Sequence, residues 1–265
     1  MTQANLDQWR ALASKELKGA DPDSLNWETL EGIAKHNGPV AAPYPWALAE
    51  VNAAWDLRLS TYASAEAQVA AVADDVAYNH HDLHDGLRAG LFTEDDLDAL
   101  PVIGEAFAEV DRLHPGLDPM RRRHEALRRV FGVMVEDVIA VAQGRIEAAQ
   151  PQSAEAIRLM DGPIIRFSKP LYQSLKSIKQ FLFQRMYRAP SVMEERARVT
   201  AILNTIFPMM LDDPRLMPED WQAEALGAGD RTACARVVLD YIAGMTDTFA
   251  LSEHRRLFDR TPDLR

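Results

Sequence analysis

Residues 64–90 read SAEAQVAAVADDVAYNHHDLHDGLRAG, and this stretch is the strongest indicator of the fold. Ser64 is a favourable helix N-cap, and Gly90 stands where a helix would end. At about 100° per residue, the apolar side chains fall within roughly 60° of one another, which predicts a core-facing stripe of Val69, Val72, Val76, Leu83 and Leu87. We therefore expect an amphipathic helix.

The same helical spacing of apolar residues recurs along most of the chain. It predicts further helices over residues 6–18, 27–35, 97–100, 102–113, 120–149, 171–187, 191–211 and 231–249, with a linker over 160–167. Alternating β-branched runs bounded by hairpin-turn residues are missing from the sequence. The sequence therefore predicts an all-α fold.

Composition excludes several classes of function. With 29 Lys+Arg and 40 Asp+Glu, the net charge of −11 argues against strong nucleic-acid binding, because neutralised phosphates supply most of that affinity. A single cysteine, Cys234, excludes an internal disulfide and any CxxC site, and favours a cytoplasmic location. No apolar run reaches the ~18 residues of a membrane span, and the N-terminus has no signal-peptide pattern.

Opposite its apolar stripe, the helix over 64–89 presents polar side chains: Asp74, Tyr78, His81, Asp82 and Asp85. Carboxylates and imidazoles bind metals, and Tyr or Asp can hydrogen-bond a sugar hydroxyl. On the pattern alone, a solvated polar surface is the favoured interpretation. His80 and His84 have the spacing of a zinc-peptidase helix, but the glutamate of that motif is missing, which argues against such an enzyme.

A cluster of arginines is the obvious candidate for binding phosphate groups. It comprises Arg121, Arg122, Arg123, Arg128 and Arg129, and the guanidinium fork matches phosphate oxygens. Ion pairs with acidic neighbours are the simpler interpretation of this cluster. Glycine-rich phosphate loops of the GxGxxG and GxxxxGK[ST] types are missing, which excludes a nucleotide site of the Rossmann or Walker kind.

Four stretches resemble the bacterial deoxyguanosinetriphosphate triphosphohydrolase family of HD-domain enzymes. Besides residues 64–90, they are 26–39 (NWETLEGIAKHNGP), 179–188 (KQFLFQRMYR) and 240–251 (DYIAGMTDTFAL), in consistent order over about residues 26–260. The resemblance implies an all-α HD-domain bundle. It also implies metal-dependent hydrolysis of a dNTP, such as dGTP, to the deoxynucleoside and inorganic triphosphate.

The resemblance also assigns site residues. The string ADDVAY over residues 73–78 matches the family helix that carries the last metal ligand, which implies that Asp74 binds a divalent metal, Mg²⁺ or Mn²⁺. Tyr78 and Asp82 match positions that contact the deoxyribose. The family motifs do not include the arginine cluster, from which Arg121, Arg122 and Arg123 are the candidates for holding the triphosphate. The resemblance implies homo-oligomers as well.

The chain departs from the family pattern before residue 27. The family's first His and its His-Asp pair precede the WETLEG motif, whereas the 26 residues before Trp27 contain no histidine. We therefore expect an HD-like bundle without its N-terminal helices, weak or absent metal binding, impaired activity and self-association. A non-catalytic helical interaction or nucleotide-binding module is the alternative.

Residues 9–25 resemble a different family, the N-terminal segment of methylmalonyl-CoA mutase. The expected organisation is accordingly a mutase-like segment over 1–25, a partial HD-type catalytic region over 26–150 and a C-terminal helical region over 151–265. The mutase-like stretch includes none of that enzyme's cobalamin-binding or catalytic parts. Mutase activity is therefore not expected.

Overall fold

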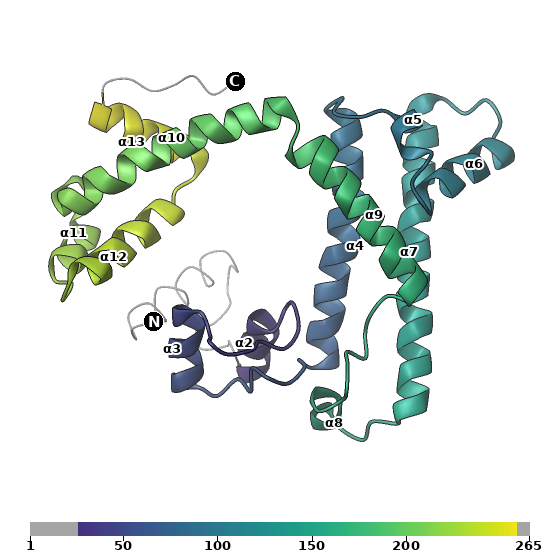
Figure 1. Ribbon diagram of the computed structural model, residues 1–265, viewed down its shortest axis with the longest axis horizontal. Helices are drawn as coiled ribbons and strands as arrows, with labels where there is room; N and C mark the ends of the chain where they lie inside the picture. The colour runs from purple at the N-terminus through teal and green to yellow at the C-terminus, as the bar shows by residue number, and fades with distance from the viewer. Residues whose placement is uncertain (1–25, 259–265) are drawn as a thin grey trace. The chain divides into compact units, whose positions relative to one another are not determined.

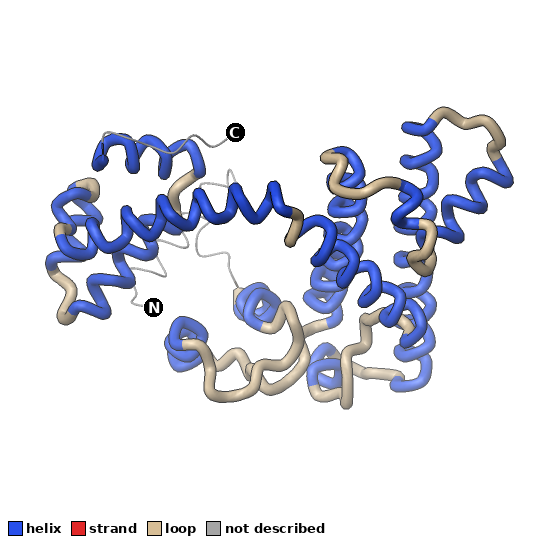
Figure 2. Tube along the Cα trace, turned by 45° about the horizontal axis from the view of Figure 1, so that its top comes forward, coloured by secondary structure: helices blue, strands red, loops and turns tan. Residues whose placement is uncertain are grey.

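The computed structural model describes residues 26–258, and every regular element in that range is helical (Figures 1 and 2). The all-α prediction is confirmed. The described residues divide into two compact units, of which the first ends at Leu182 and the second begins at Phe183. The predicted helix over 6–18 and the mutase-like stretch lie outside the described residues.

The first unit is built around two long helices that pack against each other, α4 and α7 (Figure 1). Helix α6 packs on α7, and α9 and α2 both contact α4. The helices of this unit are α2 (Trp27–Ala34), α3 (Trp46–Ala54), α4 (Ala65–Arg88), α5 (Glu94–Leu97), α6 (Ile103–Leu113), α7 (Pro119–Ala149), α8 (Ala154–Arg158) and α9 (Lys169–Leu182). Helix α3 was not expected, because prolines surround it.

Helix α4 begins as the sequence predicts, with the Ser64 hydroxyl accepting a hydrogen bond from the backbone N–H of Ala67. Val76, Leu83 and Leu87 are buried, but Val69 is 51% exposed, so the predicted core stripe is wrong in its first turn. Gln68 is buried there instead. Its amide has backbone partners, so the core face of this turn is polar.

Helix α7 also begins as its sequence indicates. The Asp118 carboxylate accepts a hydrogen bond from the backbone N–H of Arg121, and Pro119 occupies the first turn, where a missing N–H costs nothing. Leu127, Val130 and Met134 are buried. Burial of this stripe fixes the helix against its neighbours.

The second unit is a set of helices around its own apolar core. Its elements are a π-helical turn η2 (Phe183–Tyr187), α10 (Pro190–Asp212), a short 3-10 turn η3 (Pro214–Leu216), α11 (Glu219–Leu226), α12 (Arg231–Ala243) and α13 (Asp247–Phe258). The core includes Ile202, Ile206, Met210, Val238 and Ile242. One helix was predicted over 231–249, but it ends at Ala243, with Gly244 as its C-cap.

Candidate functional site

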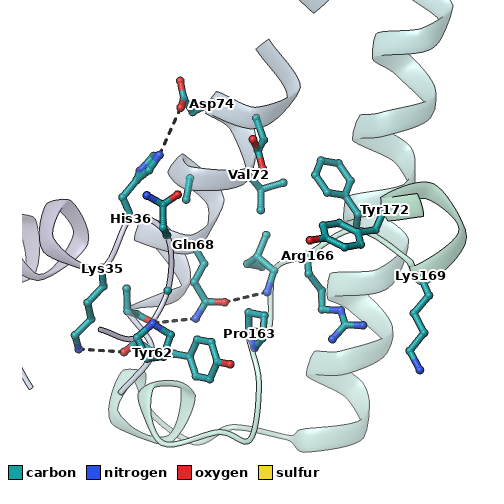
Figure 3. Close-up of a pocket in the computed structure, with 18 residues that line it drawn as sticks. Lys35, His36, Tyr62, Gln68, Val72, Asp74, Pro163, Arg166, Lys169 and Tyr172 are labelled. Atoms are coloured by element: carbon teal, nitrogen blue, oxygen red, sulfur yellow. Dashed lines mark hydrogen bonds and ion pairs between the residues drawn. The ribbon is translucent and has the colours of Figure 1, made fainter. Parts of the chain in front are cut away.

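A cavity of about 580 Å³ opens in the first unit (Figure 3). Its walls are the loop after α2, the N-terminal half of α4, and the segment over 163–172 that leads into α9. Asp74 and Asp75 line it from α4, and His36 lines it from the loop. The cavity therefore contains the residue that the sequence singles out as a metal ligand.

Asp74 and Asp75 are adjacent in sequence but have different partners. The His36 Nε2 atom lies 3.4 Å from the Asp74 Oδ2 atom, and these side chains are 43% and 70% exposed. The Lys179 Nζ atom from α9 lies 2.7 Å from the Asp75 Oδ1 atom. Asp75 is thus neutralised by a lysine, whereas Asp74 remains accessible next to an imidazole.

A buried ionic network holds the wall that carries His36. Glu31, on α2, accepts hydrogen bonds from Arg158 at 2.8–3.0 Å and from Lys35 Nζ at 2.9 Å. Lys35 Nζ also donates to Thr61 Oγ1 and to the carbonyl oxygen of Tyr62. The network joins α2, α8 and the 61–62 segment, and so fixes the position of the residue before His36.

The network shifts the pKa values of its members. Burial alone would raise the pKa of Glu31, but hydrogen bonds from Arg158 and Lys35 outweigh it and hold that pKa below the ordinary value. Burial lowers the pKa of Lys35, although its bond to Glu31 opposes the shift. The charged carboxylate of Glu31 is therefore part of the folded structure.

Gln68 connects α4 to the opposite wall of the cavity. Its Oε1 atom accepts hydrogen bonds from the backbone N–H groups of Ile164 and Ile165 at 2.8 and 3.1 Å. Its Nε2 atom donates to the carbonyl oxygen of Ala63 at 2.8 Å. This clamp positions the 163–172 segment beside α4 (Figure 3).

The predicted sugar-contacting residues lie further along α4. Tyr78 and Asp82 follow Asp74 by four and eight residues, so the three side chains share one face of the helix, as predicted. Tyr78 is 46% exposed. Neither Tyr78 nor Asp82 lines the cavity that contains Asp74.

The predicted phosphate-binding arginines are engaged with carboxylates. Arg121 pairs with Asp118 at 3.3 Å, Arg122 with Asp111 and Glu94, and Arg123 with Glu94 at 3.0 Å. None of these arginines lines the cavity beside Asp74. The structure thus favours the simpler interpretation, in which this cluster forms ion pairs.

Comparison with known proteins agrees with the resemblance in the sequence. Residues 165–256 match the model of the phosphohydrolase-associated domain. The deoxyguanosinetriphosphate triphosphohydrolase-like protein of Paracoccus denitrificans is 71% identical over 255 residues, which is 96% of this chain and 68% of that protein. Proteins with the same name from Cereibacter sphaeroides and Roseobacter denitrificans are 68% and 56% identical, over 96% and 97% of this chain and 68% and 67% of their own lengths. The chain belongs to the deoxyguanosinetriphosphate triphosphohydrolase-like family.

The donor atoms around Asp74 do not complete a metal site in this member of the triphosphohydrolase-like family. Within residues 26–258, no group of three or more His, Cys, Asp or Glu side chains is arranged to hold a metal ion. All seven histidines of the chain fall in that range. Asp74 and His36 alone therefore do not fit a bound divalent metal.

A second group of histidines lies apart from Asp74. His80 and His84 from α4, and His124 from α7, line a separate cavity of about 390 Å³. The ring centroids of His84 and His124 are 5.2 Å apart. Burial lowers the pKa of His80, and the neighbouring histidines add to that shift. These side chains bring three imidazoles together between α4 and α7.

Sequence analysis did not identify several residues of the cavity in this family member. Arg166, Lys169 and Tyr172 line it from a segment predicted only as a linker and the start of a helix. Nothing in their spacing distinguishes them from other polar residues. His36 lies within the family-like stretch over 26–39, which was the one available signal.

Within residues 26–258, no helix is long and apolar enough to cross a membrane.

Proposed function

We propose that this chain supplies the substrate-orienting part of a dNTP triphosphohydrolase, with dGTP as the reference substrate. In the reaction, the oxygen of water adds to the α-phosphorus and the bond to the 5′-oxygen breaks. The 5′-oxygen takes up a proton, so that the products are deoxyguanosine and inorganic triphosphate. The observation that supports the proposal is the alignment of Asp74, Tyr78 and Asp82 on one face of α4, with Asp74 at a cavity.

Each of these residues has a stated role in the proposal. Asp74 contributes one carboxylate ligand to a divalent ion, and Tyr78 and Asp82 hydrogen-bond the deoxyribose. Binding of Mg²⁺ or Mn²⁺ requires ligands beyond Asp74 and His36, because those two donors do not complete a site. What the chain itself contributes is the orientation of the nucleotide along α4.

The alternative is a non-catalytic helical module that binds nucleotides or other subunits. The incomplete donor set around Asp74 favours this alternative. Both proposals place the protein in the cytoplasm. They differ in whether Asp74 is needed for turnover.

We also propose that the chain self-associates with a second copy. Phe131, Ile139 and Ile146 on α7 are 40%, 51% and 44% exposed, and exposed apolar surface favours association. Sedimentation of the purified chain should show a dimer or larger species. A monomer at tens of micromolar protein would contradict this proposal.

Assay of dGTP hydrolysis tests the main proposal. The 265-residue chain alone, with Mg²⁺ or Mn²⁺, should release no triphosphate above background. Joined to the part of the Paracoccus denitrificans relative that it does not match, it should turn over dGTP, and Asp74→Asn should nearly abolish that turnover. A folded chimera without activity, or activity that survives Asp74→Asn, would support the non-catalytic alternative.

A further inference from the structure

The cavity beside Asp74 extends in one direction along α4. Its α4 wall runs from Gln68 to Asp75, so it reaches about 9 Å before Asp74 at 1.5 Å per residue. Tyr78 and Asp82 lie about 6 and 12 Å beyond Asp74 in the opposite direction. Asp74 therefore separates the predicted sugar-contacting positions from the cavity.

Two cations line the cavity without a carboxylate partner. Arg166 and Lys169 form no ion pair or side-chain hydrogen bond within the described part of the chain, whereas Lys35 binds Glu31. Figure 3 shows both side chains extending in the same direction from their segment, while His36 and Asp74 meet elsewhere on the cavity wall. In a chain of net charge −11, two unpaired cations at one cavity create a local positive potential, which favours an anionic ligand.

We propose that Arg166 and Lys169 receive the terminal phosphates of a nucleoside triphosphate. The inference rests on the proposed function for its direction. If Tyr78 and Asp82 hold the sugar and Asp74 lies near the α-phosphate, the β- and γ-phosphates extend toward Gln68 and the two cations. The guanidinium of Arg166 binds two phosphate oxygens as a fork, and Lys169 adds a point charge.

The volume and the charges of the cavity fit this ligand. About 580 Å³ lies within the range of small-molecule sites and accommodates a triphosphate with water. Arg121, Arg122 and Arg123 are less suited to the role, because phosphate would have to displace the carboxylates that they bind. The nucleotide thus lies along α4 with its sugar toward Tyr78 and its phosphates toward Arg166.

Inorganic tripolyphosphate is the probe that tests this site without any metal. Calorimetric titration of the full chain at low salt, without divalent ions, should show binding that weakens as salt is added. Arg166→Gln and Lys169→Gln should each weaken binding about tenfold, as expected for the loss of one charge-assisted contact. Arg121→Gln removes the same charge from an arginine outside the cavity and should leave the affinity unchanged.

Three results would overturn the proposal: no binding by the folded parent chain, unchanged affinity in both cavity variants, or an equal loss in Arg121→Gln. Circular dichroism establishes that each variant is folded. Arg166→Lys, which keeps the charge but not the fork, should retain part of the affinity and guards against a folding defect in Arg166→Gln.

Asp74→Asn distinguishes this inference from the proposed function. It removes a negative charge from the cavity, so metal-free binding of tripolyphosphate should be unchanged or tighter. Loss of hydrolysis is expected from the same variant in the chimera. If tripolyphosphate binding depends on Arg166 in a chimera that never hydrolyses dGTP, the proposed function is rejected and the phosphate site is retained. If the chimera hydrolyses dGTP but its tripolyphosphate binding does not depend on Arg166, the phosphate site is rejected and the proposed function is retained.

Discussion

Arg158 binds both carboxylate oxygens of Glu31, a residue 127 positions away in the sequence, through nitrogen–oxygen distances of 2.8–3.0 Å. Both side chains are buried, and Lys35, the C-cap of α2, completes the network. Each charge of a buried ion pair has lost its hydration, so the pair is favourable only when the two groups are closely hydrogen-bonded. Glu31 therefore fixes the wall that carries His36.

Glu31→Gln should lower the free energy of unfolding by about 3–5 kcal/mol, because it leaves Lys35 buried without a counter-charge and leaves Arg158 with only Glu155, 3.9 Å away. Urea denaturation followed by circular dichroism measures this loss. Asp212→Asn is the matched control: both side chains of its pair with Arg231 are exposed, so the change should stay within about 1 kcal/mol. Equal losses in the two variants would show that the buried network stabilises the fold no more than an exposed ion pair does.

The same network gives a pH dependence. The folded-state pKa of Glu31 is lowered, so its stabilisation is fully present above the ordinary carboxylate pKa and is lost as pH falls through the lowered value. In Glu31→Gln this component of acid destabilisation should disappear.

His80 should make the protein less stable in mild acid. Burial lowers its folded-state pKa, and its Nδ1 atom has no hydrogen-bond partner within the described residues. Below about pH 6.5, His80 therefore takes up a proton in the unfolded chain but not in the folded chain. The free energy of unfolding decreases as pH falls from about 6.5 to the lowered pKa of His80. Repulsion from His81, His84 and His124 lowers that pKa further, and Arg128 lines the same cavity.

Denaturation at pH 7.5 and pH 5.5 measures this effect. His80→Gln should reduce the difference in unfolding free energy between the two pH values. His114→Gln, at an exposed position, should retain the parent difference. Identical differences in the parent and His80→Gln would contradict the assignment to His80.

The sequence predicted those parts of the fold that depend on local patterns. Ser64 caps its helix as expected, because capping and amphipathic spacing involve neighbouring residues. The burial of Gln68 in place of Val69 was not predictable, because it depends on hydrogen bonds to residues 164 and 165.

In the candidate site, too, only the features set by neighbouring residues could be predicted from the sequence. The shared face of Asp74, Tyr78 and Asp82 follows from helix geometry alone. Arg166 and Lys169 reach the cavity only through the tertiary position of a segment without periodicity. Sequence analysis instead selected Arg121, Arg122 and Arg123, because clustering in sequence is visible. The pairing of Arg122 and Arg123 with Glu94, 28 and 29 residues away, is not.

Tyr241 should be replaceable by phenylalanine without loss of stability. It is 7% exposed and packs against Trp221 at a centroid distance of 5.4 Å, but its hydroxyl has no hydrogen-bond partner within residues 26–258. Removing a desolvated, unpaired hydroxyl should raise the free energy of unfolding by up to about 1 kcal/mol. Tyr172→Phe, at a half-exposed position, should change nothing, and a loss above 1 kcal/mol in Tyr241→Phe would reveal a partner for the hydroxyl.

Tyr78 and Asp82 should determine the choice between deoxyribose and ribose, which is measured in the active chimera. Tyr78→Ala and Asp82→Ala leave Asp74 in place but remove the proposed sugar contacts. Each contact contributes on the order of 1–3 kcal/mol when desolvated and hydrogen-bonded, so kcat/KM for dGTP should fall roughly tenfold to a few hundredfold.

Discrimination against GTP should fall most in Tyr78→Ala, because the ring of Tyr78 would occupy the space that a 2′-hydroxyl requires. Steady-state kinetics with dGTP and GTP side by side measure both effects. Glu66→Ala, in the first turn of α4, is the control and should match the parent. If Tyr78 and Asp82 only form a solvated surface, their alanine variants will also lie within about 0.5 kcal/mol of the parent for both substrates, and the orientation of the nucleotide along α4 would then be wrong.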